Sequence, residues 1–220
     1  MSFERLIALL LVLASAVYFA RLAPIAIQGW RVYSGTGRRH QQDATGRTPD
    51  MPPDVADRIA LLEQAGYHRL GETSLELPVG IRYAWIVAAD DAESYAILAG
   101  GMPARPSRTG IYSAWSDGTW LGTQHPFGAQ IDRAGLQVRA VATTLGDAVR
   151  THREAVERLR VVHGAPRSVH SMADMLALDI DYRTRFGGMR LRPLTLRIVL
   201  PALVMGCTLL LSLALLVVTR

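Results

Sequence analysis

The chain has 220 residues, of which 50% are hydrophobic, and this length accommodates one ordinary domain with additional helices. All 24 basic residues are arginine, and the absence of lysine and asparagine excludes Schiff-base lysines, P-loop lysines and N-glycosylation. The formal net charge of +5 comes from arginines spread along the chain or placed beside its apolar ends, so we expect no nucleic-acid binding.

The first apolar stretch runs from Leu6 to Ala20 and stops at Arg21. Its length alone fits the core of a signal peptide, and Ala14-Ser15-Ala16 resembles a cleavage site. The apolar pattern resumes over 22–27, however, so a helix could continue past Arg21 while the guanidinium reaches toward water. We therefore predict a retained transmembrane anchor over 1–30, with a cleaved signal peptide as the alternative.

The last stretch, Ile198 to Thr219, has no charged residue and is dense in leucine and valine. A helix of about 20 apolar residues spans the hydrocarbon layer of a bilayer. The sequence therefore predicts a C-terminal transmembrane helix over 198–220, preceded by a basic juxtamembrane segment over 187–197.

The arginines next to these two apolar stretches predict the orientation. They outnumber those on the outer ends, so the positive-inside bias places the central domain in the cytoplasm of a two-span cell-membrane protein. A domain on the other side of the membrane is the alternative. The arginines before the second stretch are also predicted to contact lipid headgroups, although they could serve as topology signals alone: Arg183, Arg185, Arg190, Arg192 and Arg197.

The region between the apolar ends reads as a polar linker followed by one α+β domain. Residues 31–53 are predicted to be a flexible linker, and the domain covers 54–186. We expect an antiparallel sheet of about five strands packed by about three helices, because the connections between strands are too short for parallel crossovers. The expected helices cover 54–64, 144–163 and 171–186, and the expected strands cover 81–89, 95–99, 109–115, 119–123 and 136–142.

An aromatic hairpin is the first candidate binding site. The Asp117-Gly118 turn lies between Trp115 and Trp120, and His125 follows the second strand. The functional interpretation is an aromatic groove with His125 at its mouth, and the alternative is ordinary sheet packing around a turn. The two tryptophans need not share a face, since side chains alternate along a strand.

His152 is the second candidate because it lies in the apolar stripe of the helix expected over 144–163. A buried, hydrogen-bonded histidine is the alternative to a proton-handling group. His163 follows about 16 Å further along the helix, too far for both rings to bind one ion. The lone Cys207 excludes an intrachain disulfide. We expect no metal and no cofactor.

Three short motifs resemble those of uncharacterised bacterial membrane-anchored proteins. They are Ala65-Gly66-Tyr67-His68-Arg69-Leu70-Gly71, Trp115 to Thr123, and His152 to Leu159. The resemblance implies an α+β domain on membrane anchors and no assigned activity.

The sequence contains no nucleophile elbow, P-loop or dinucleotide-binding pattern. We therefore expect an accessory or interaction module whose partners are the lipid bilayer and other membrane proteins. Two alternatives remain, a hydrolase-like enzyme using His125 or His152 with an aspartate, and a subunit of a larger complex with helix contacts at Ala202 and Gly206.

Overall fold

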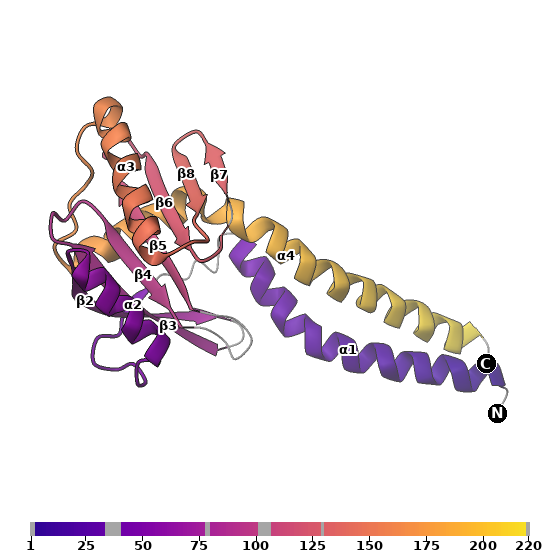
Figure 1. Ribbon diagram of the computed structural model, residues 1–220. Coiled ribbons are helices and arrows are strands. Elements are labelled where there is room, and N and C mark those ends of the chain that lie inside the picture. Colours follow the sequence, from indigo (N-terminus) through magenta and orange to yellow (C-terminus); the bar gives the residue numbers. More distant parts are fainter. Residues whose placement is uncertain (1–2, 34–40, 78–79, 101–106, 129, 219–220) are drawn as a thin grey trace. The chain divides into compact units, whose positions relative to one another are not determined.

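The computed structural model describes the chain except for residues 1–2, 34–40, 78–79, 101–106, 129 and 219–220 (Figure 1). The described residues fall into two compact units. One unit contains α1 (Phe3–Tyr33) and most of α4 (Met172–Val218). The other contains the sheet, α2 (Pro53–Gln64), α3 (Leu145–His163) and the first turns of α4.

The sheet has eight strands in the order β1-β2-β3-β4-β5-β6-β8-β7. The strands are β1 (Gln42–Asp43), β2 (Tyr67–Leu77), β3 (Gly80–Ala89), β4 (Tyr95–Ala99), β5 (Arg108–Ala114), β6 (Trp120–His125), β7 (Ile131–Arg133) and β8 (Leu136–Ala140). The register from β3 to β6 is antiparallel, with Ile97 opposite Gly110 and Ile111 opposite Thr123. β8 inserts between β6 and β7 and runs parallel to β6.

The α+β class fits the structure, but the expected antiparallel sheet of about five strands is wrong. The sheet is larger and mixed, because three short or polar strands, β1, β2 and β7, join those that the sequence indicated. β1 lies within the segment that was predicted to be a linker. It pairs Gln42 with Ser74 and Asp43 with Thr73.

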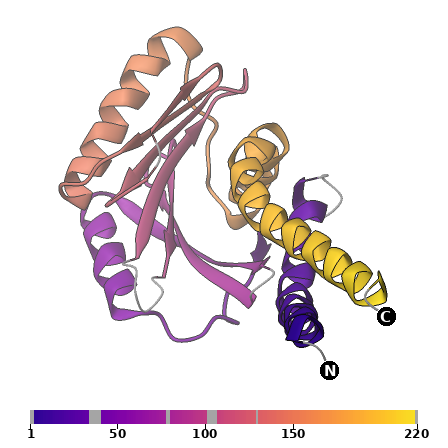
Figure 2. The same ribbon diagram turned by 90° about the vertical axis from the view of Figure 1, so that its right-hand side faces the viewer.

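Helices α2 and α3 cover one face of the sheet (Figure 2). Val55, Ile59 and Leu62 of α2 are fully buried in the core that includes Trp85 and Leu98. Burial of each such aliphatic side chain contributes about 1.5–3 kcal/mol. These helices therefore fix which side chains of β3–β6 face them.

α3 begins and ends where the sequence indicates. The Thr144 hydroxyl accepts from the Asp147 backbone N–H at 3.0 Å, which caps the first turn. Gly164 ends the helix with φ 76°, a conformation that favours glycine, and its N–H donates to the Arg160 carbonyl. This well-defined helix positions His152 over the sheet.

The two predicted membrane spans are wrong. Across the described residues, no helix combines the length and hydropathy needed to cross a bilayer. The prediction of spans relied on the apolar residues of the two stretches, and the helices that contain these stretches also contain polar and helix-distorting residues. α1 includes Arg21 and Pro24, and α4 begins at Met172 among aspartates and arginines. The finding contradicts the predicted transmembrane helices over 1–30 and 198–220 and the predicted two-span membrane location.

Candidate functional site

The aromatic hairpin does not form a groove lined by both tryptophans. Trp115 packs under α3 with Leu121 and Val156, whereas Trp120 lies on the opposite face of the sheet, 5.1 Å from the ring of Tyr182 in α4. Both indoles are only 1% exposed. The structure therefore separates two of the predicted binding residues and buries each of them.

Asp117 instead meets a histidine that the site prediction did not include. Its carboxylate lies 2.6 Å from Nδ1 of His163, and its other oxygen accepts from the Thr119 backbone N–H. The Thr119 bond and then the His163 contact hold the pKa of Asp117 below its usual range. Trp115 donates from Nε1 to the Gly164 carbonyl, so the end of α3 is fastened to this turn. The position of His163 at a helix end could not indicate the contact without knowledge of the fold.

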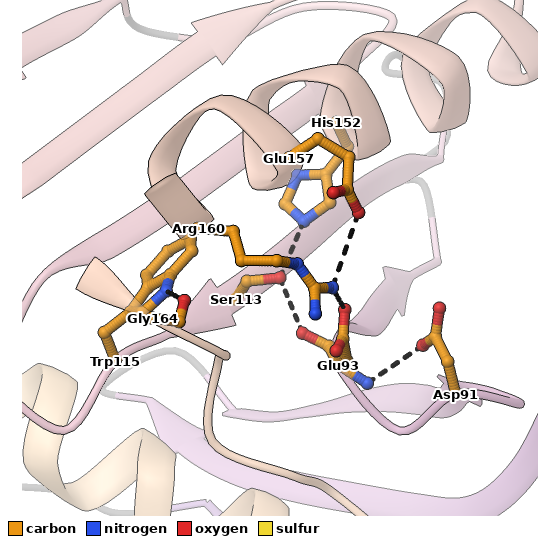
Figure 3. A network of polar contacts seen from close by, with 8 residues as sticks. All are labelled: Asp91, Glu93, Ser113, Trp115, His152, Glu157, Arg160 and Gly164. Carbon is orange, nitrogen blue, oxygen red and sulfur yellow. Dashed lines mark hydrogen bonds and ion pairs between the residues drawn. The ribbon is translucent and has the colours of Figure 1, made fainter. Parts of the chain in front are cut away.

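His152 is completely buried between α3 and the sheet (Figure 3). Its Nε2 lies 3.0 Å from the Ser113 hydroxyl, and its Nδ1 lies 3.0 Å from the Thr123 hydroxyl. Ser113 donates its own proton to the Glu93 carbonyl at 2.8 Å. The Ser113 oxygen must therefore accept from Nε2, and Thr123 must donate to Nδ1.

This proton arrangement is the reverse of the one that a hydrolase needs. A nucleophilic serine gives its proton to the imidazole, and a carboxylate orients the imidazole from the other side. Here the Ser113 proton points to a carbonyl and Thr123 occupies the orienting position. Burial, with a smaller effect from Arg153, lowers the pKa of His152 to about 3, so the ring is neutral. His152 therefore connects α3 to β5 and β6 through two buried hydrogen bonds.

His125 lies at the end of β6 and is 8% exposed. Its Nδ1 accepts from Nη1 of Arg58 at 3.1 Å, because a guanidinium can only donate. Nε2 then carries the proton and faces the Thr143 carbonyl at 3.5 Å. Burial lowers the pKa of His125, the Thr143 carbonyl opposes this effect, and the Arg58 charge adds to it. The ring meets no carboxylate among the described contacts.

An ion network joins α3 to the turn between β3 and β4 (Figure 3). Arg160 pairs with Glu93 and lies 3.4 Å from Glu157. The bond to Glu93 is the main cause that raises the pKa of Arg160. Glu93 is also the residue whose carbonyl accepts from Ser113, so the network and the His152 cluster stabilise the same turn.

The predicted lipid-headgroup contacts and the question of a metal site concern other parts of the chain. The headgroup role of the five arginines depended on a second span, and no helix in the described part of the chain is long and apolar enough to be one. Arg183 and Arg185 lie on α4, and the side chains of Arg190, Arg192 and Arg197 are outside the described part. Within the described ranges, no group of three His, Cys, Asp or Glu side chains could hold a metal ion.

Comparison of the chain with protein-family models, characterised proteins and solved structures finds no match.

Proposed function

We propose that the chain is an interaction module that binds a partner protein through an apolar surface on α1 and α4. The observation that supports this function is the exposure of large apolar side chains along both helices. Leu200 and Leu203 are 61% and 60% exposed, and Leu210 is 69% exposed. The others are Leu6, Ile7, Leu9, Leu10, Leu11, Leu13, Val17, Tyr18, Ile27, Val204, Leu211, Leu213 and Val217.

Such a concentration of apolar side chains is unusual for a surface that remains in water. Contiguous exposed apolar patches mark interaction sites, whereas scattered hydrophobic residues need no explanation. Covering one leucine side chain contributes about 1.5–3 kcal/mol, so even partial cover of this surface supplies a large driving force. A partner with apolar helices of its own would complement it best.

The surface is distinct from the contact between α1 and α4. A Cβ added at Gly206 would lie 3.1 Å from the Phe19 ring, so this glycine lets the two helices pack closely within one chain. Gly206 was one of two residues expected to contact other subunits. Its intrachain contact leaves the outward-facing leucines as the docking surface.

Site-specific photocrosslinking tests the proposal. A photoreactive amino acid at Leu210 of the full chain should give a discrete protein adduct in cells. The same group at Val161 of α3, which is 88% exposed, should not. Leu203→Gln combined with Leu211→Gln should abolish the Leu210 adduct, because two amide side chains would then be buried at the contact.

Two outcomes would refute this function. The first is an equal yield of adducts from Leu210 and Val161, which would mean that the helices have no specific partner. The second is a chain that gives no protein adduct but floats with phosphatidylcholine vesicles, because the apolar surface would then be covered by lipid.

A further inference from the structure

Arg58 of α2 is held in a fixed position by two side chains of the sheet. Its Nη1 donates to the Thr109 hydroxyl at 3.3 Å and to Nδ1 of His125 at 3.1 Å. Thr109 is opposite His125 in the pairing of β5 with β6, so both acceptors come from one register position. The guanidinium is therefore anchored where α2 crosses the end of this hairpin.

Neither acceptor compensates the charge of Arg58. A hydroxyl and a neutral imidazole accept hydrogen bonds but carry no negative charge. Among the described ion pairs, other arginines meet carboxylates, such as Arg69 with Glu63 and Arg150 with Asp147, and none involves Arg58. A half-buried cation outside any ion pair is costly, since it loses part of its hydration without gaining a paired counter-charge.

The carboxylate one turn earlier on α2 has another partner. Asp54 lies one turn before Arg58 and accepts from the Ser107 hydroxyl. Residues four apart on a helix are neighbours, so this position could have supplied the counter-charge. The Asp54 carboxylate instead binds Ser107, next to β5.

The guanidinium also keeps hydrogen-bond donors available. Both of its bonds within the described part use Nη1, so Nε and Nη2 make none there. Arg58 is only partly buried, so its side chain remains within reach of solvent. Nε and Nη2 form one side of the planar fork that matches two oxygens of a carboxylate or a phosphate.

We propose that Arg58, positioned by His125 and Thr109, is a binding site for an oxyanion, with phosphate or carboxylate oxygens bound by its Nε and Nη2. Arg58 is the binding residue, and His125 and Thr109 are positioning residues that fix the plane of the guanidinium. The low pKa of His125 supports this assignment, because a neutral ring continues to accept from Arg58 at neutral pH. This site lies in the sheet-containing unit and is independent of the apolar surface on α1 and α4.

Calorimetric titration of the full chain with inorganic phosphate tests the site, with acetate as the carboxylate probe. Sodium chloride at matched ionic strength controls for screening. We expect saturable binding of at least one probe in the millimolar range. Arg58→Gln should weaken it by about tenfold or more, because a charge-assisted bidentate contact is lost.

Two further variants make the result specific. Arg69→Gln removes an exposed arginine on β2 and the same unit of charge, and should leave the binding constant unchanged. Arg58→Lys keeps the charge but not the fork and should still weaken binding. If Arg58→Gln fails to fold, Arg58→Lys tests the site in its place.

The proposal is overturned if neither phosphate nor acetate binds saturably beyond the chloride control. It is equally overturned if folded Arg58→Gln or Arg58→Lys binds as tightly as Arg69→Gln. A comparison of the two probes shows whether the site prefers phosphate or carboxylate, and either preference supports it.

Discussion

Replacement of Ser113 by alanine should destabilise the sheet domain far more than an ordinary serine substitution. The hydroxyl accepts from Nε2 of His152 and donates to the Glu93 carbonyl. Its removal therefore leaves the His152 N–H without an acceptor and the Glu93 carbonyl without this donor. His152 is 0% exposed, and water cannot replace the lost acceptor. An orphaned buried donor costs about 1–3 kcal/mol and the lost bond to Glu93 adds about 1 kcal/mol, giving about 2–4 kcal/mol in total.

Urea unfolding followed by tryptophan fluorescence measures this loss, because Trp115 and Trp120 are buried in the same domain. Ser116→Ala is the matched control. Ser116 is exposed in the hairpin turn, and its substitution should change the free energy of unfolding by less than about 0.5 kcal/mol.

A double variant tests whether the loss of stability in Ser113→Ala comes from the His152 N–H that is left without an acceptor. His152→Leu removes the orphaned N–H, so Ser113→Ala should cost much less in that background. The reasoning is refuted if Ser113→Ala matches Ser116→Ala, or if the effects of Ser113→Ala and His152→Leu simply add.

Three further predictions concern the same unit. The pKa of His152 is about 3 in the folded chain and 6.5 in the unfolded chain, so the unfolded chain binds more protons between these pH values. The free energy of unfolding should therefore fall as the pH drops from about 6.5 toward 3, by at most about 1.4 kcal/mol per pH unit. Urea titrations at several pH values should show a shallower fall in His152→Leu, and an identical slope in both proteins would contradict the assignment. Thr144→Ala should cost about 1 kcal/mol through loss of the α3 cap while Thr144→Ser retains it, as measured by urea unfolding; equal effects of the two substitutions would contradict the capping role. Gly110→Ala should lower the melting temperature, because the added Cβ would lie 2.4 Å from the Tyr112 hydroxyl. In the matched control Gly146→Ala, the added Cβ would lie 3.8 Å from the Thr144 hydroxyl, so the melting temperature should not fall.

Local sequence patterns were sufficient for the elements that alternate clearly or carry caps. β3, β4, β5, β6 and β8 follow the expected strands closely, and α2 and α3 match their predicted helices within a residue or two. Each of these elements buries a face that its own periodicity reveals. Thr144 and Gly164 marked the ends of α3 through their backbone chemistry, which needs no tertiary information.

The missed elements depend on neighbours rather than on their own pattern. β2 begins with Tyr67 but continues through polar residues, and β1 and β7 are too short to show any period. α4 continues through Gly187-Gly188, where the sequence predicted a stop. Glycine costs about 1 kcal/mol within a helix, a penalty that the rest of a long helix can exceed.

The candidate site was predictable only in part. The position of His152 in an apolar stripe indicated burial, and the structure confirms that alternative. Its hydroxyl partners come from two different strands, and Arg58 reaches His125 across 67 positions of sequence. Such pairings follow from strand register, which a single sequence does not specify for a mixed sheet.

The outermost strands of the sheet limit how copies of this domain can associate. β1 has two residues and β7 has three, and exposed Asp43, Asp132 and Arg133 lie on these borders. Short, charged border strands offer few backbone groups to an incoming chain and oppose fibre-like lateral growth. Neither β1 nor β7 is therefore a good template on which a second copy of the domain could add a strand.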